Sequence, residues 1–79
     1  MNDTYVMNQI RNDLAQTRAA LREHIDCERE ICAEHGPRAF RTHKRYLRAR
    51  CNELQSELQH MRANMDQTRY ALWTAYLTD

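Results

Sequence analysis

Thiol and imidazole side chains, which bind zinc and can act as nucleophile and base, cluster around the middle of this chain. They are His24, Cys27, Cys32, His35, His43 and Cys51. Cys32 and His35 are one helical turn apart and His43 follows soon after, so these three are the candidate zinc ligands. Neither a CxxC nor an HxxxH pair is present, and Cys27 and Cys32 would point about 140° apart on a helix. The sequence therefore predicts no bound metal and no cofactor.

No arrangement in the sequence favours catalysis. The chain shows no nucleophile beside a base, no carboxylate pair set in a pocket and no glycine-rich loop to cradle a phosphate. Cys27 and His43 come nearest to a thiol–imidazole pair. Two helices enclose no pocket around such a pair, so we expect a protein that is not an enzyme.

The elements that must position these side chains are predicted to be helices. In 79 residues there is one glycine and one proline, adjacent at Gly36 and Pro37, and most other residue types favour helix. Glycine ends a helix and proline begins the next one. We therefore expect one all-α domain over residues 1–79, with a helix over 4–35, a turn at 36–37 and a helix over 38–77. The helices should form an antiparallel, coiled-coil-like hairpin.

Apolar residues recur with heptad spacing along both predicted helices and define a seam. A tight turn places residues opposite each other when their numbers sum to about 71 or 72, so that Met7 faces Met65 and His24 faces Leu47. Glu28 and Lys44, the only charged seam residues, then face each other with opposite charge. Burying either charge alone would cost several kcal/mol, so this ion pair is expected to fix the register. The alternative is that both side chains reach solvent near the turn.

The eleven arginines are not spread evenly around the predicted hairpin. Ten of them lie along one face with Asp66 as the only acid, whereas Arg50 lies on the other face with most of the acids. The net charge of +1 hides this separation. A stripe of one sign is a docking surface for something negative. The residues expected to bind a polyanion or an acidic partner are Arg11, Arg18, Arg38, Arg41, Lys44, Arg45, Arg48, Arg62 and Arg69.

Three interpretations of the arginine face are open. The arginines can reach acids three or four residues away, in surface pairs worth only a few tenths of a kcal/mol. The face can instead grip an acidic protein through arginine–carboxylate contacts. It can also bind nucleic acid through the segment from Arg38 to Arg48, with Phe40, His43 and Tyr46 near enough to stack on bases. In layout alone, a short hairpin that dimerises is similar to the plasmid copy-number regulator Rop, which holds RNA; no sequence motif is shared.

The predicted register leaves the end of the second helix without a partner. An exposed apolar patch of this kind marks an interface, with tryptophan and tyrosine as anchors; the alternative is a helix end that curls back over the N-terminus. Because so thin a seam is marginal alone, we expect a homodimer in the form of a four-helix bundle. The predicted interface residues are Tyr5, Tyr70, Trp73, Tyr76 and Leu77.

These patterns predict a small non-enzymatic interaction protein that binds and modulates, or inhibits, a larger protein or complex. The small size and the many arginines are typical of an accessory factor from a phage or another mobile element. Without a long apolar run or a signal peptide, and with three cysteines, we expect a cytoplasmic protein with no membrane partner, in the host cytoplasm if phage-encoded. The alternatives are a nucleic-acid-binding regulator and a protein that binds small phosphorylated ligands at an oligomer interface.

Overall fold

The structure, a computed structural model, describes the backbone of residues 3–78 and the side chains of residues 4–69, 71 and 72. Over this range the chain forms three helices and no strand: α1 (Asp3–Asp26), α2 (Glu28–His35) and α3 (Pro37–Thr78). The prediction of an all-α chain is confirmed. The prediction of one unbroken helix over 4–35 is wrong, because the first helix ends at Asp26 and a second begins at Glu28.

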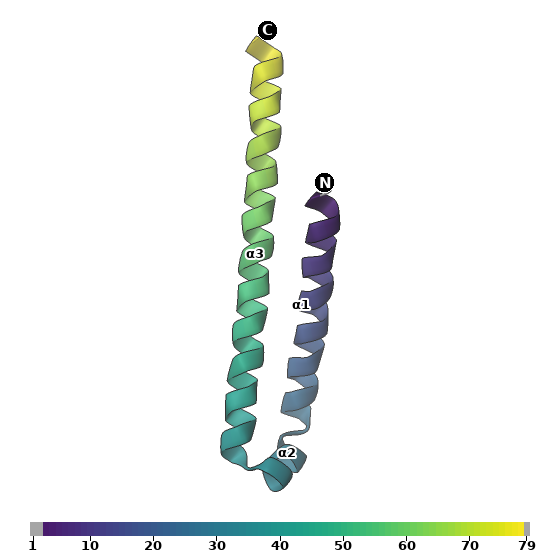
Figure 1. Ribbon diagram of the computed structural model, residues 1–79, viewed down its shortest axis with the longest axis vertical. Helices are drawn as coiled ribbons and strands as arrows, with labels where there is room; N and C mark the ends of the chain where they lie inside the picture. The colour runs from purple at the N-terminus through teal and green to yellow at the C-terminus, as the bar shows by residue number, and fades with distance from the viewer. Residues whose placement is uncertain (1–2, 79) are drawn as a thin grey trace.

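The break between α1 and α2 lies at Cys27, whose φ of −99° and ψ of 20° leave the helical region. Hydrogen bonds from the Cys27 N–H to the Glu23 carbonyl (3.0 Å) and from the Ile31 N–H to the Cys27 carbonyl (3.0 Å) lie on either side of it. Two antiparallel helices are usually joined by about 2–8 residues. Between α2 and α3 only Gly36 lies outside a helix, which is too short a connection to cross from one side of the rod to the other. The short α2 therefore carries the chain across from α1 to α3 (Figure 1).

Gly36 joins α2 to α3 through its own backbone groups. Its N–H donates to the Cys32 carbonyl (2.9 Å), which closes α2, and its carbonyl accepts from the Phe40 N–H (3.2 Å), which opens α3. Its φ of +93° belongs to a region that favours glycine. The turn predicted at 36–37 is thus narrower than expected, since Pro37 is already the first residue of α3.

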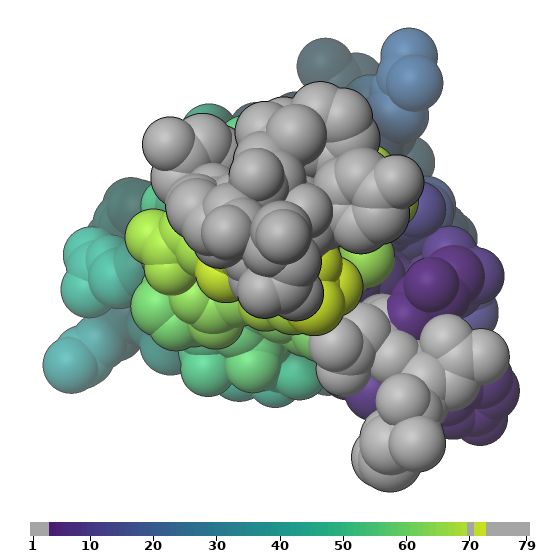
Figure 2. Space-filling model, turned by 90° about the horizontal axis from the view of Figure 1, so that it is seen from above, coloured from purple at the N-terminus to yellow at the C-terminus, as the bar shows by residue number. Residues whose placement is uncertain are grey.

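Helices α1 and α3 run antiparallel and side by side (Figures 1 and 2). The end-on view of Figure 2 shows α1, in purple, on one side and the green part of α3 on the other. Six buried side chains form the core, and within each helix they are spaced by three, four or seven residues, as the predicted heptad seam requires: Met7, Leu14, Phe40, Leu47, Cys51 and Leu54. Leu14, Cys51 and Leu54 make one cluster, against which Ile10 and Leu21 pack.

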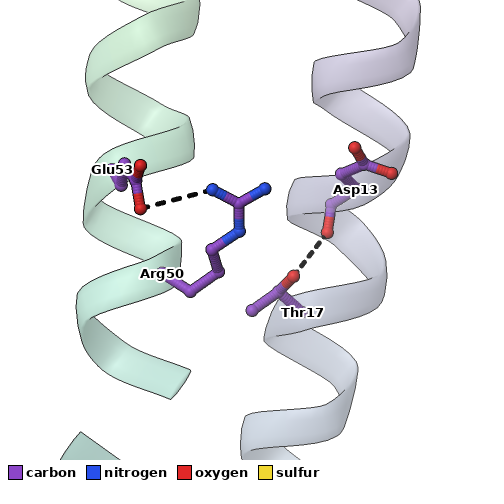
Figure 3. A network of polar contacts seen from close by, with 4 residues as sticks. All are labelled: Asp13, Thr17, Arg50 and Glu53. Atoms are coloured by element: carbon purple, nitrogen blue, oxygen red, sulfur yellow. Dashed lines mark hydrogen bonds and ion pairs between the residues drawn. The ribbon is translucent and has the colours of Figure 1, made fainter. Parts of the chain in front are cut away.

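Threonine fills two seam positions without leaving its hydroxyl unsatisfied. The Thr17 hydroxyl donates to the Asp13 carbonyl (2.7 Å; Figure 3), and the Thr68 hydroxyl donates to the Asn64 carbonyl (2.9 Å). Bonds of this kind satisfy the hydroxyl within its own helix and add no contact between the helices. The core is therefore thin.

The result is a rod of 68 × 17 × 17 Å with two different ends. We call the end around α2, residues 24–47, the turn end. The open end comprises residues 4–10 and 57–72, beyond which α3 continues past the start of α1 (Figure 1). No helix in the described part of the chain is both long and apolar enough to span a bilayer.

Candidate functional site

Among the described side chains, Arg50 is the arginine that forms an ion pair. Within the described side chains, two pairs have nitrogen and oxygen within 4.0 Å: Arg50 with Glu53 at 3.2 Å, and His35 with Glu34 at 3.8 Å. Figure 3 shows the half-buried Arg50 side chain lying between the two helices with its guanidinium directed to Glu53. Arg50 is the one arginine that the sequence placed on the acidic side of the rod. In the first interpretation of the arginine face, arginines pair with acids three or four residues away; among the described side chains no arginine of that face forms such a pair.

Four of the unpaired cations line one shallow groove on α3, of about 240 Å³. We call it the basic groove, and its residues are Arg41, Lys44, Arg45 and Arg48. The three arginines are exposed and Lys44 is half-buried. Like charges at i,i+4 on a helix are destabilising by about 0.2–0.5 kcal/mol per pair, and this groove contains two such pairs. The cations are thus held together without an acid to offset their repulsion.

A second groove extends the positive charge to the open end and includes one arginine of α1. Arg11, Arg62 and Arg69 line it together with Met7, Met65 and Asp66. Arg41, Arg48, Arg62 and Arg69 are separated by multiples of seven residues, so they share one edge of α3. We call Arg11, Arg62, Arg69 and the basic groove together the basic flank. Arg18 and Arg38 are exposed but line neither groove.

Arg29 is not part of the flank, although the sequence placed it there. It lines a groove at the junction of α1 and α2 with Asp26, Glu28, Glu30 and Cys32. The break at Cys27 is the physical reason, because the seven-residue spacing from Arg22 to Arg29 no longer keeps both on one face. The turn end therefore presents an acidic surface beside the basic one.

Four rings and one cation meet at the turn end, in contacts that the sequence did not predict. His24 stacks on Phe40, with ring centroids 4.5 Å apart and planes at 12°. His24 also meets His43 edge-on at 4.8 Å, and His43 stacks on Tyr46 at 6.0 Å. The Lys44 ammonium lies 5.4 Å from the centre of the Phe40 ring. These contacts enclose Phe40, which is 2% exposed.

His24 also ties the end of α1 to the start of α3. Its Nε2 lies 3.0 Å from the Phe40 carbonyl oxygen, and a bond to a carbonyl requires that this nitrogen donate the proton. The predicted neighbour of His24 was Leu47, so the register departs from prediction here. Towards the open end it follows the prediction more closely, since Met7 and Met65 line the same groove.

The predicted ion pair between Glu28 and Lys44 is not formed. Glu28 is exposed and lines the acidic groove of α2, whereas Lys44 lies over the Phe40 ring and in the basic groove. The prediction assumed an unbroken first helix. Once the chain changes direction at Cys27, Glu28 no longer belongs to the seam that α1 presents to α3.

The aromatic rings near the basic cluster do not line the basic groove. Tyr46 stacks on His43, and His43 meets the His24 ring edge-on. At about 100° per residue, Tyr46 lies roughly 100° around α3 from Arg45. The expected combination of arginine and stacking surface is therefore absent from the described lining of the groove.

The thiols and imidazoles do not assemble a metal site or a catalytic pair within the described residues. No three histidine, cysteine, aspartate or glutamate side chains come close enough there to hold a metal ion, so Cys32, His35 and His43 form no such group. Cys27, Cys32 and Cys51 are free thiols, and Cys51 is buried in the core. His43 contacts His24 and Tyr46 rather than Cys27.

Exposed apolar side chains mark the open end. Leu72 is 67% exposed and Tyr5 is 63% exposed, the latter with its hydroxyl accepting a hydrogen bond from the Gln9 amide (3.1 Å). An open groove of about 280 Å³ follows α3 here, lined by Met61, Asn64, Met65, Thr68 and Arg69. Of the other predicted interface residues, the side chains of Tyr70, Trp73, Tyr76 and Leu77 lie outside the described residues.

No protein-family model, no curated protein and no solved structure matches this chain.

Proposed function

We propose that this protein is a small non-enzymatic interaction protein that works as a homodimer and that binds and modulates a larger protein or complex. The observation that supports this best is the amount of surface the chain exposes. Its accessible area is 6646 Å², whereas a compact folded chain of 9.5 kDa exposes about 5,000 Å². The excess of about 1,600 Å² is twice the ~800 Å² that each partner contributes to an interface of standard size.

The open end is the surface that a second copy fits. Met61 and Met65 line grooves with Ile10 and Met7 of α1, and Thr68 and Leu72 continue the same heptad stripe along α3. Beyond the start of α1 this stripe has no intramolecular partner, as Leu72 shows by its 67% exposure. The same stripe on a second α3, running antiparallel, supplies a matching surface. Such a pairing is symmetric, because each copy contributes the same residues.

Leu72→Gln tests this interface while leaving the turn end untouched. In sedimentation equilibrium the wild-type chain should have twice the mass of 9.5 kDa, and the variant should shift towards the monomer with the same helical circular dichroism. Gln67→Ala is the matched control, since Gln67 is exposed on the same turns of α3 but lies off the seam. Tyr5→Ala provides a second variant on α1.

Two results would contradict the proposal. One is a wild-type chain that stays monomeric at every concentration. The other is measured with a photo-crosslinker placed at position 72 in the source cell, and it is the absence of any product with the mass of two chains. A product with the mass of two chains supports the homodimer, whereas a product with a different protein alone shows that the larger partner itself occupies the open end.

A further inference from the structure

We propose that the basic flank binds the phosphate backbone of double-stranded nucleic acid. The cations of the flank form no ion pair among the described side chains, although Arg11 donates a hydrogen bond to the Asn8 amide oxygen (3.3 Å) and Lys44 lies over the Phe40 ring. None of the arginines of the flank has a carboxylate within ion-pairing distance among the described side chains, whereas Arg50, outside the flank, does. Like charges that have no acid beside them and lie along one side of a two-helix rod keep a positive potential that a structural role does not require.

The shape of the flank fits a long, regularly charged partner. From Arg41 to Arg69 the cations extend over about 42 Å of α3, at 1.5 Å per residue. A strand of duplex DNA carries one phosphate per ~3.4 Å of its axis and winds around that axis, so a straight flank of this length meets phosphates wherever the backbone crosses the side of the duplex that faces it. The rod is straight over this length (Figure 1). An extended array of this kind is matched by a nucleic-acid backbone rather than by a local acidic patch on a protein.

The residues between the two groups of arginines also fit phosphates. Asn52, Gln55 and Gln59 lie on the same edge of α3 by their heptad spacing, and all three are exposed. Asparagine and glutamine donate hydrogen bonds to phosphate oxygens in nucleic-acid complexes. A membrane-binding face would instead carry leucine, phenylalanine or tryptophan among its cations. The flank has no such side chain between Arg48 and Arg62.

The contact is expected to read neither base sequence nor unpaired bases. The rod is 17 Å across, which is wider than the ~12 Å major groove that admits a single helix. Single-strand binders stack bases on aromatic rings, whereas Tyr46 and His43, although exposed, lie outside the basic groove. Phosphate contacts to an intact duplex remain as the mode of binding.

The near-zero net charge does not prevent this contact. Most of the acids lie across the rod or at the junction of α1 and α2, and the rod is 17 Å wide. At about 0.1 M salt, charges more than ~10 Å apart are largely screened. Asp66 is the one acid in the grooves of the flank, so the strongest binding is expected at Arg41, Arg45 and Arg48.

The test is the salt dependence of duplex binding, measured by fluorescence anisotropy with one duplex DNA and one duplex RNA of about the length of the flank. The logarithm of the binding constant should fall linearly with the logarithm of salt concentration. Replacing Arg41, Arg45 and Arg48 together with glutamine should reduce that slope by about 3, at ~0.9 per lost phosphate contact. Arg50→Gln removes one arginine outside the flank and should leave the slope unchanged.

Binding to either duplex with this pattern supports the proposal, and the stronger of the two names the nucleic acid. Three results would overturn it. They are no binding to either duplex at low salt, a triple variant whose slope equals that of wild type, and equally tight binding to a single strand. The test is independent of dimerisation when repeated with Leu72→Gln, because that residue lies outside the flank.

Discussion

At the turn end of the rod Phe40 is 2% exposed and lies between the His24 ring and the Lys44 ammonium, whereas at the open end Leu72 of the same helix is 67% exposed. The heptad that places both residues on the seam is the same. They differ in what faces them, because α1 and α2 cover the first part of α3 and end before the last. Equal patterning thus gives one end where the seam residue of α3 is covered and one end where it is exposed.

The largest effect expected from this comparison is on folding at the turn end. Phe40→Ala should lower the free energy of unfolding by about 3–5 kcal/mol, since it removes a fully buried ring and leaves a cavity. Met65→Ala at the open end should cost roughly half as much or less, because Met65 is only half-buried. Urea unfolding at one fixed protein concentration measures both. Equal losses would show that the two ends do not differ in stability.

A smaller effect should follow from breaking the hydrogen bond of His24 while keeping its ring contact. His24→Phe keeps an aromatic side chain on Phe40 but removes the Nε2 donor to the Phe40 carbonyl. The expected loss is about 1 kcal/mol, which corresponds to a melting temperature lower by about 4–8 °C for a domain of this size. A variant as stable as wild type would show that stacking, not the hydrogen bond, joins α1 to α3.

The sequence predicted the features that depend on periodicity or on special residues. Gly36 and Pro37 located the reversal, and the six buried side chains keep the spacing of the predicted heptad seam. The break at Cys27 was missed because its φ and ψ are accessible to any residue, so no glycine or proline marks it. The error spread from there to Glu28 and Arg29, whose predicted places assumed an unbroken helix.

In the candidate site, too, some features could be predicted from residue spacing and others could not. The exposure of the arginines followed from their spacing, and Arg50 was set apart from the others correctly. Whether each guanidinium pairs with an acid depends on side-chain geometry, which spacing does not determine. The separation of Tyr46 and His43 from the basic groove follows from helical spacing on α3, but the ring contact between His43 and His24 depends on how α1 and α2 pack, which spacing does not determine.

Amide hydrogen exchange at two protein concentrations tests most directly whether the open end is where a second copy binds. Protection of amides in residues 61–72 should increase with concentration, because association covers this part of α3. Protection in residues 37–54, already covered by α1 and α2, should change little. If residues 61–72 exchange at the same rate at both concentrations, or if the increase falls in residues 37–54 instead, the open end is not the interface.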